Sequence, residues 1–231
     1  MKKILLILFI FSAMISKAQV SNFFNFGWAV SSGPNGGLNM LVDNYNNSRP
    51  WLDNKMEPFH VFHGAVIGAG IITANGLFEM GLSEKHKIHH SSGVDNTGHI
   101  AYGDIKYKEN TLDIGVARGG SIKGKVNFFF GAAANAGTSK LLTRNWHDFE
   151  SRTSLVKLKN QNFALGATLF FDVRSAGEGL SLRFFYPLPI LRQDFNEENA
   201  AINNYHINDP ALKTSPSNFG FRICIQNGWF N

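Results

Sequence analysis

The chain has 231 residues, of which 44% are hydrophobic and 17% are charged, and its formal charge is +5. The single cysteine, Cys224, excludes a fold that depends on intramolecular disulfides. The small positive charge gives no argument for nucleic-acid binding, because part of it lies in an N-terminal leader.

The first residues have the pattern of a secretory signal peptide. Two lysines precede an apolar run over residues 4–15, and small residues occupy the two positions that a signal peptidase reads before a cut after Ala18. The run is shorter than the roughly 20 apolar residues of a spanning helix. We therefore expect a signal peptide over residues 1–18 and a single mature domain over residues 19–231. Loss of the three leader lysines lowers the formal charge from +5 to +2.

Period-two alternation of apolar and polar residues recurs along the mature chain and predicts β-strands. In "FNFGWAV", for example, Phe24, Phe26 and Trp28 share one face, and Asn25 lies on the other. A further segment, residues 59–72, is apolar on both faces and is predicted as a strand from its valine, isoleucine and glycine content. The seven alternating segments are residues 24–30, 77–85, 110–117, 126–137, 162–174, 180–188 and 219–226.

The connections alternate between short, glycine-bearing turns and long polar loops, as in outer-membrane barrels with short periplasmic turns and longer external loops. An even strand count places both ends of the chain on the periplasmic side. The sequence therefore predicts an all-β fold, a roughly eight-stranded antiparallel up-and-down transmembrane β-barrel. The short turns are residues 73–76, 119–125 and 175–179, and the long loops are residues 33–58, 89–98, 141–161 and 192–217.

In such a barrel the apolar faces meet lipid, and the polar faces line an interior just wide enough for side chains to fill. Arg183 lies within the apolar run "GLSLRFFYPLP" and is tolerated because it points inward, where Glu79, Asp113 or Asp172 would be its partner. Phe129 is an exception, since it interrupts a polar face. The predicted interior polar cluster comprises Glu79, Asp113, Asp172, Arg174, Arg183, Arg222 and Gln226.

Alternation alone does not say which face is the interior. The alternative fold is a soluble periplasmic barrel of the lipocalin type, with the apolar faces inward around an apolar ligand. The phenylalanine-rich apolar faces, the glycine- and alanine-rich polar faces and the unequal loops favour the membrane barrel. A small channel is a further alternative, although a narrow interior filled by side chains argues against a general diffusion pore.

Four histidines are the candidate metal ligands of the sequence. His86, His89, His90 and His99 lie close together in "EKHKIHHSSGVDNTGH", where a hairpin would bring His99 back towards the others. Three imidazoles would form a site for zinc or copper, but the spacing matches no defined metal motif. A polar, solvated loop is the preferred interpretation, and no cofactor is expected.

The ingredients of an outer-membrane lipid-modifying enzyme are present in "NWHDFES", which contains His147, Asp148 and Ser151. A hydrolase would need a serine, a histidine and an acid held together. No serine of the chain lies in a GxSxG frame or a similar nucleophile motif, so we expect no enzyme.

The first long loop contains a candidate amphipathic helix. In "GGLNMLVDNYNNS", Leu38, Leu41, Val42 and Tyr45 follow helical spacing. We expect a short helix here that packs on the rim of the barrel.

Several segments resemble the small outer-membrane β-barrel proteins of Bacteroidota, within the broad OmpA-like membrane-barrel group. They are the leader end "SKAQ", the first strand "GWAV" and the last strand "NFGFRICIQNGWF", in which Phe230 takes the place of the terminal aromatic residue. The resemblance covers nearly the whole mature chain and carries no catalytic motif. It implies an outer-membrane location and a structural or interaction role carried by external loops. The implied partners are outer-membrane lipids, the barrel assembly machinery, and a protein or ligand at the loops.

Overall fold

A computed structural model describes most of the mature chain. The predicted signal peptide and Phe230 lie outside the described residues. No helix among the described residues is long and apolar enough to cross a membrane. The described residues are 21–33, 35–122, 125–158, 162–175, 179–203, 208–214 and 218–229.

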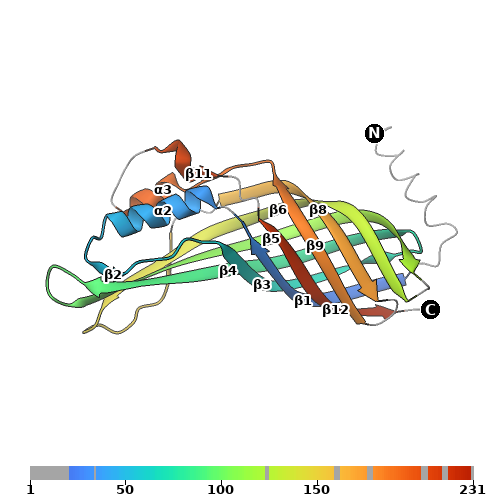
Figure 1. The fold of residues 1–231 in the computed structure, drawn as a ribbon, viewed down its shortest axis with the longest axis horizontal. Coiled ribbons are helices and arrows are strands. Elements are labelled where there is room, and N and C mark those ends of the chain that lie inside the picture. Colours follow the sequence, from blue (N-terminus) through green and yellow to red (C-terminus); the bar gives the residue numbers. More distant parts are fainter. Residues whose placement is uncertain are drawn as a thin grey trace.

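Eight antiparallel strands form a closed barrel, as the alternation predicts (Figure 1). Their order around the ring is β4-β3-β1-β12-β9-β8-β6-β5, and β5 pairs back with β4. Asn22 pairs with Trp229, so the first and last strands meet with both chain ends at the same end of the barrel. The strands are β1 (Ser21–Ser32), β3 (Val61–Ile72), β4 (Gly76–Val94), β5 (Ile100–Ile122), β6 (Val126–His147), β8 (Asn162–Ser175), β9 (Gly179–Pro189) and β12 (Phe219–Trp229).

The strand pairing is strongly staggered around the barrel. The paired residue can be followed from strand to strand around the ring, starting at Trp28. Through β3, β4 and β5 this path reaches Thr138 on β6. Through β12, β9 and β8 it reaches a different residue of β6, Phe128, whereas without a stagger both paths would end at the same residue. A stagger of this kind requires strands that tilt against the barrel axis.

Side chains alternate between the two sides of the barrel wall as the sequence predicts. Phe26 is 56% exposed and Ile114 45%, whereas their inward-facing neighbours Asn25 and Gly115 are buried. We call the exposed outward apolar side chains of the eight strands the apolar belt. Its members include Phe26, Met80, Ile114, Phe130, Phe184 and Ile225. The lipocalin-type arrangement, with these faces turned inward, is not the one that the chain adopts.

Three strands are much longer than predicted. β4, β5 and β6 have 19, 23 and 22 residues, and they continue past their last pairings with β3 and β8 as a three-stranded sheet. We call this part, residues 87–94, 100–108 and 140–147, the strand extension. The predicted loops 89–98 and 141–161 were therefore wrong at their start, because β4 continues to Val94 and β6 to His147.

Short elements cover one side of the strand extension, at the end of the barrel opposite to the chain ends (Figure 1). They include the predicted helix, α2 (Gly36–Asn47), and all four residues expected on its apolar face are buried. A second helix, α3 (Asn196–Asn203), was not predicted. The remaining short elements are β2 (Leu52–Asn54), β7 (Val156–Lys157), β10 (Gln193–Asp194), η1 (Pro210–Leu212) and β11 (Lys213–Thr214).

Asparagine side chains fix α2 in place, which explains its polar composition. The Asn39 carboxamide oxygen accepts the backbone N–H of Phe59 at 2.7 Å. The Asn46 side chain bonds both the N–H and the C=O of Met56, at 3.0 and 2.9 Å. Asn44 donates to Asn199 of α3 at 3.0 Å. The helix is thus joined to the entry of β3 and to the second helix.

The buried hydrophobic side chains among the described residues form two separate clusters. One lies between the covering elements and the strand extension, and it joins Leu41 and Val42 of α2 to Ile105, Tyr107 and Leu141 of the strands. The other lies inside the barrel near the chain ends. It consists of Phe23, Ile72, Leu77, Phe129, Ala133 and Phe170, which explains why Phe129 interrupts the polar face of its strand.

Candidate functional site

A network of charged side chains crosses the interior of the barrel. We call it the charge cluster, and its members are buried although they come from strands on different sides of the ring. Glycines on the inward faces leave room for their long side chains. The charge cluster consists of Asn25, Glu79, Asp172, Arg174, Arg183, Arg222 and Gln226.

Arg183 is held by two carboxylates. Its Nε donates to Oδ2 of Asp172 at 2.8 Å, and its Nη2 donates to Oε2 of Glu79 at 2.9 Å. Asp172 lies directly opposite Arg183 in the pairing of β8 with β9. Two of the three partners left open by the sequence are therefore used, and Asp113 is not among them.

Glu79 is the common acceptor of the charge cluster. Besides Arg183, it accepts from Nη2 of Arg174 at 2.5 Å and from Nη2 of Arg222. Arg222 and Arg183 lie opposite each other on β12 and β9, a repulsive pairing unless an anion lies between them. Arg174 also donates to Asp172 at 2.8 Å. Three arginines are thus held by two carboxylates, and Glu79 contacts all three.

Aromatic rings complete the surroundings of two arginines. The guanidinium carbon of Arg174 lies 4.3 Å from the ring centroid of Phe23, and that of Arg183 lies 4.0 Å from the centroid of Phe170. Cation–π contacts of this kind strengthen when they are desolvated. The charge cluster therefore rests directly on the hydrophobic cluster near the chain ends.

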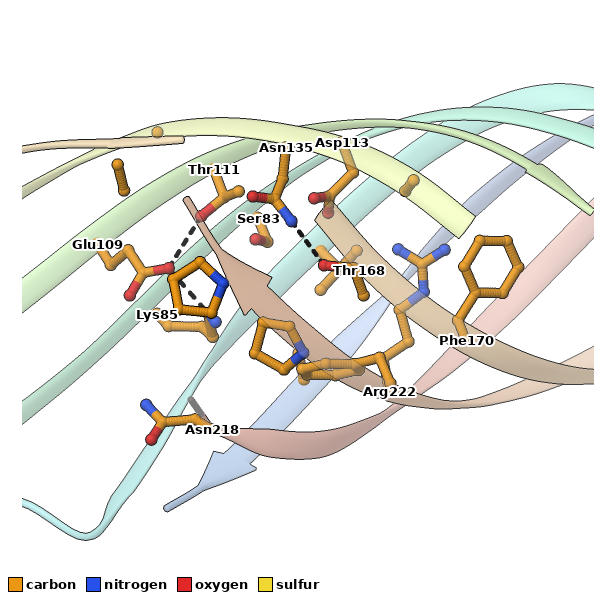
Figure 2. Close-up of a pocket in the computed structure, with 18 of the residues that line it drawn as sticks. Ser83, Lys85, Glu109, Thr111, Asp113, Asn135, Thr168, Phe170, Asn218 and Arg222 are labelled. Atoms are coloured by element: carbon orange, nitrogen blue, oxygen red, sulfur yellow. Dashed lines mark hydrogen bonds and ion pairs between the residues drawn. The ribbon is translucent and has the colours of Figure 1, made fainter. Parts of the chain in front are cut away.

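A cavity of about 110 Å³ lies beside the charge cluster, on the side towards the strand extension (Figure 2). Part of its wall is polar, since Lys85 and Glu109 form an ion pair at 3.5 Å and Asn135 donates to Thr168 at 2.6 Å, but apolar side chains line the larger part. The Asp113 side chain faces this cavity, and no hydrogen bond or ion pair joins it to another described side chain. A space of this size is large enough for several water molecules at its polar groups.

The four candidate metal ligands lie in different surroundings. His86 and His90 share the outward face of β4, and His89 lies on the opposite face. His86 packs against His63 at 5.2 Å between ring centroids, and His89 packs edge-on against Phe59 at 4.5 Å. Among the described residues, no group of three or more potential ligands could hold a metal ion.

The remaining two histidines of that set have acidic partners. His90 contacts Asp104 across the β4–β5 pairing through its Nδ1. His99, in the turn between β4 and β5, lies 3.5 Å from Asp148.

His147 also lies at the tip of the strand extension, where two acidic side chains contact its ring. Its ring nitrogens lie 3.1 Å from Asp95 and 3.3 Å from Glu150, so its acidic partners are not the predicted Asp148. Desolvation would lower the pKa of His147, but its bonds to Glu150 and Asp95 outweigh this and raise the pKa above its usual value. The Thr97 hydroxyl is the main cause that lowers the pKa of Asp95 to about 2.

The outward face of the strand extension carries an aromatic and cationic surface that the sequence analysis missed. Tyr102 stacks on Trp146 with 5.1 Å between ring centroids. Arg144 and Arg152 lie 5.3 and 5.1 Å from the Trp146 ring, and Asp104 binds both guanidinium groups at 2.5 and 3.0 Å. We call these residues the tip surface. The alternation of Ile105 and Tyr107 with Lys106 and Lys108 was the signal that could have extended the predicted strand towards them.

No protein-family model and no curated protein matches the chain. Among solved structures, the chain is similar to Ail, the attachment invasion locus protein of Yersinia pestis, in its crystal structure with the heparin analogue sucrose octasulfate. The alignment covers 91% of this chain and 99% of Ail, with 9% sequence identity and a TM-score of 0.41.

Proposed function

We propose that the chain is an outer-membrane β-barrel that anchors the strand extension outside the cell and presents its tip surface to a partner. The observation that carries this proposal is a reversal of polarity along β4, β5 and β6. On β5, outward-facing Leu112, Ile114 and Val116 are followed by Lys108 and Lys106 on the same face.

The opposite face of β5 reverses in the other direction. Its inward residues inside the barrel are Asp113, Thr111 and Glu109, whereas Tyr107 and Ile105 are buried under the covering elements. A strand that passes from hydrocarbon into water should change in this way, because its outward side chains exchange lipid for solvent. The continuous run of outward apolar residues ends at paired positions on β4 and β6, where Glu84 follows Leu82 and Thr138 follows Ala136 on the outward face.

The charge cluster supports an anchoring role rather than free diffusion of solutes. Its side chains occupy the interior at the level of the apolar belt, and an eight-stranded barrel leaves little space beside them. The same cluster argues against a carrier of apolar ligands, since such a ligand would meet buried guanidinium groups.

The composition of the tip surface supports its use in recognition. Trp146, Tyr102, Arg144 and Arg152 are of the residue types that dominate binding energy at protein interfaces. Tyr102, Arg144 and Trp146 lie on the face of the sheet opposite to Ile105 and Leu141, which pack under the covering elements. The proposed function is therefore to hold an interaction surface in a fixed position outside the membrane, without catalysis.

Fractionation with heat-modifiability tests the anchoring. Retention of the protein in carbonate-washed outer membranes, together with a gel-mobility shift on boiling, is the expected result. Release into the soluble fraction would overturn the proposal.

Orientation is tested by labelling single cysteines with an impermeant maleimide in intact cells. Cys224 is buried and gives little background. Lys55→Cys lies in the covering segment and should react in intact cells. Ser121→Cys lies on β5 at the end of the barrel near the two chain ends and should react only after lysis. The reverse pattern would place the strand extension in the periplasm.

A further inference from the structure

We propose that four lysines above the apolar belt bind the phosphate groups of lipid headgroups in the leaflet around the far end of the barrel. This lysine patch consists of Lys106, Lys108, Lys140 and Lys157. The inference rests on the proposed insertion into the membrane, and it adds a specific class of lipid to it.

The strand pairing places the four lysines next to one another. Lys108 on β5 lies directly opposite Lys140 on β6. Lys106, two residues along β5, lies opposite Leu142, and Leu142 lies opposite Lys157 on β7. Like charges opposite each other on neighbouring strands destabilise a sheet. An anion shared between them would remove this repulsion.

The acidic side chains on this face do not reach every lysine of the patch. Glu84 forms an ion pair with Lys108 at 2.5 Å. Asp104, on the same face, is engaged by Arg144, Arg152 and His90. Among the described residues, Lys106 and Lys140 have no ion-pair partner. Positive charge therefore remains on this face.

The position of the lysine patch selects the lipid headgroup as its partner. Lys108 and Lys140 point to the same side of the wall as Leu112 and Ala136, four residues nearer the barrel centre. Four residues span roughly 13 Å along a strand, and tilt reduces the height. The headgroup region on each side of a bilayer is about 5–7 Å thick.

Lysine side chains can close the remaining gap. Their long apolar stems allow the ammonium groups to reach down towards the phosphate level. Lipid chains that cover the apolar belt of β5 and β6 therefore have headgroups that lie next to the lysine patch, on its side towards the barrel centre. A soluble polyanion would have no such fixed position relative to the wall.

The test compares lipid preference in reconstituted full-length protein. Wild type is placed in vesicles of phosphatidylcholine with a spin-labelled phosphatidylglycerol or a spin-labelled phosphatidylcholine, and the relative association constant of the two labels is measured. The variant Lys106→Gln/Lys140→Gln removes the two lysines without an ion-pair partner. The control Lys55→Gln/Lys213→Gln removes the same charge outside the patch, from the covering segments.

We expect wild type and the control to prefer phosphatidylglycerol, and the patch variant to lose about fivefold or more of that preference, given the usual contribution of a lysine at an anionic surface. Equal preference in the patch variant and wild type, or equal loss in the control, would overturn the inference. Displacement of labelled phosphatidylglycerol by millimolar inorganic phosphate would also overturn it, because the site would then recognise the free ion.

Failure of the inference and failure of membrane insertion give different results. If the patch variant and the wild type both insert and shift on boiling but neither prefers phosphatidylglycerol, the proposed lipid binding by the lysine patch is wrong and the anchoring proposal stands. A wild type that does not insert into vesicles would remove the anchoring proposal and this inference together.

Discussion

The strand extension continues three of the eight strands of the barrel, but the two regions are organised in opposite ways. Inside the barrel, β4, β5 and β6 turn polar side chains inward and apolar ones outward. In the strand extension, Ile105, Tyr107 and Leu141 are buried on the inward side, and lysines, arginines and histidines lie outward. The period of two does not change across the boundary. In the proposed membrane orientation, lipid surrounds the barrel and water surrounds the strand extension, and this difference accounts for which face is apolar.

The two regions also differ in what holds their interiors together. The strand extension has a hydrophobic core, in which each side chain contributes through burial and packing. The barrel interior has charges that tolerate burial only as a complete set, because each one needs its partners. Single changes should therefore act very unequally in the two regions, and between the two faces of one strand.

The largest effect is expected for Glu79→Gln. The change leaves three buried arginines with Asp172 as their carboxylate partner, and an uncompensated buried charge costs about 3–5 kcal/mol. Denaturant unfolding in detergent micelles, followed by the loss of the heat-modifiable form, measures the difference. Glu84→Gln on the same strand breaks a surface pair with Lys108 and should cost less than about 1 kcal/mol. Similar losses for both variants would contradict the role of Glu79 as the common acceptor.

A smaller effect is expected for Ile114→Arg, which places a charge on the apolar belt. A lipid-facing arginine at the membrane midplane costs about 2–4 kcal/mol, and one near the interface costs about 0–1 kcal/mol. Asn110→Arg, on the same face of β5 four residues nearer the strand extension, is the matched control. Folding yield and unfolding free energy in lipid vesicles measure both. If the two variants were equally stable, the apolar belt would not face lipid at Ile114.

The smallest effect is expected at the tip, where the titrating groups are exposed. The pKa of His147 is raised in the folded protein by its bonds to Asp95 and Glu150. These bonds therefore stabilise the folded tip fully at a pH below the ordinary histidine pKa of about 6.5. The stabilisation is lost as the pH rises through the higher pKa of the folded state. Asp95, with a pKa of about 2, stays charged throughout. Hydrogen exchange of the turn at Thr97 and His99, corrected for intrinsic rates, should therefore increase between pH 6 and 8.

His147→Gln is the control for this titration, since it should remove the pH dependence of exchange at the tip. Exchange in the barrel section of β5 should not change in either protein. A His147 that titrates at or below its ordinary value in an NMR titration would contradict the prediction.

The sequence predicted the barrel because alternation survives wherever one face meets a uniform apolar environment. It did not predict the strand extension, since the run from Lys106 to Lys108 reverses the pattern and "HHSSGVDNTGH" has the composition of a loop. Helix α2 was recognisable from the spacing of its apolar residues. Helix α3 was not, because "NEENAAIN" has few apolar residues and is held by asparagine contacts with α2.

The pairs within the charge cluster were beyond a single sequence for a different reason. Glu79 and Arg183 are 104 residues apart, and they meet because the stagger of the barrel sets their heights. Inward orientation follows from alternation, whereas height depends on the summed register of all eight strands. The same limitation applies to Asp113, one of the three carboxylates considered as a partner of Arg183, which faces the cavity without an ion pair to it.

The continuity of β5 from barrel to tip has a mechanical consequence. From Leu112 to Ala101 the strand covers roughly 36 Å, and a tilt of about 40° leaves a height of roughly 28 Å above the hydrocarbon edge. A flexible loop of equal length would sample many positions, and ordering it on contact would weaken binding. Two paired neighbours stiffen the strand instead, so that the tip surface keeps a fixed stand-off distance and direction. A ligand would therefore meet it as a rigid probe that reaches past shorter surface molecules.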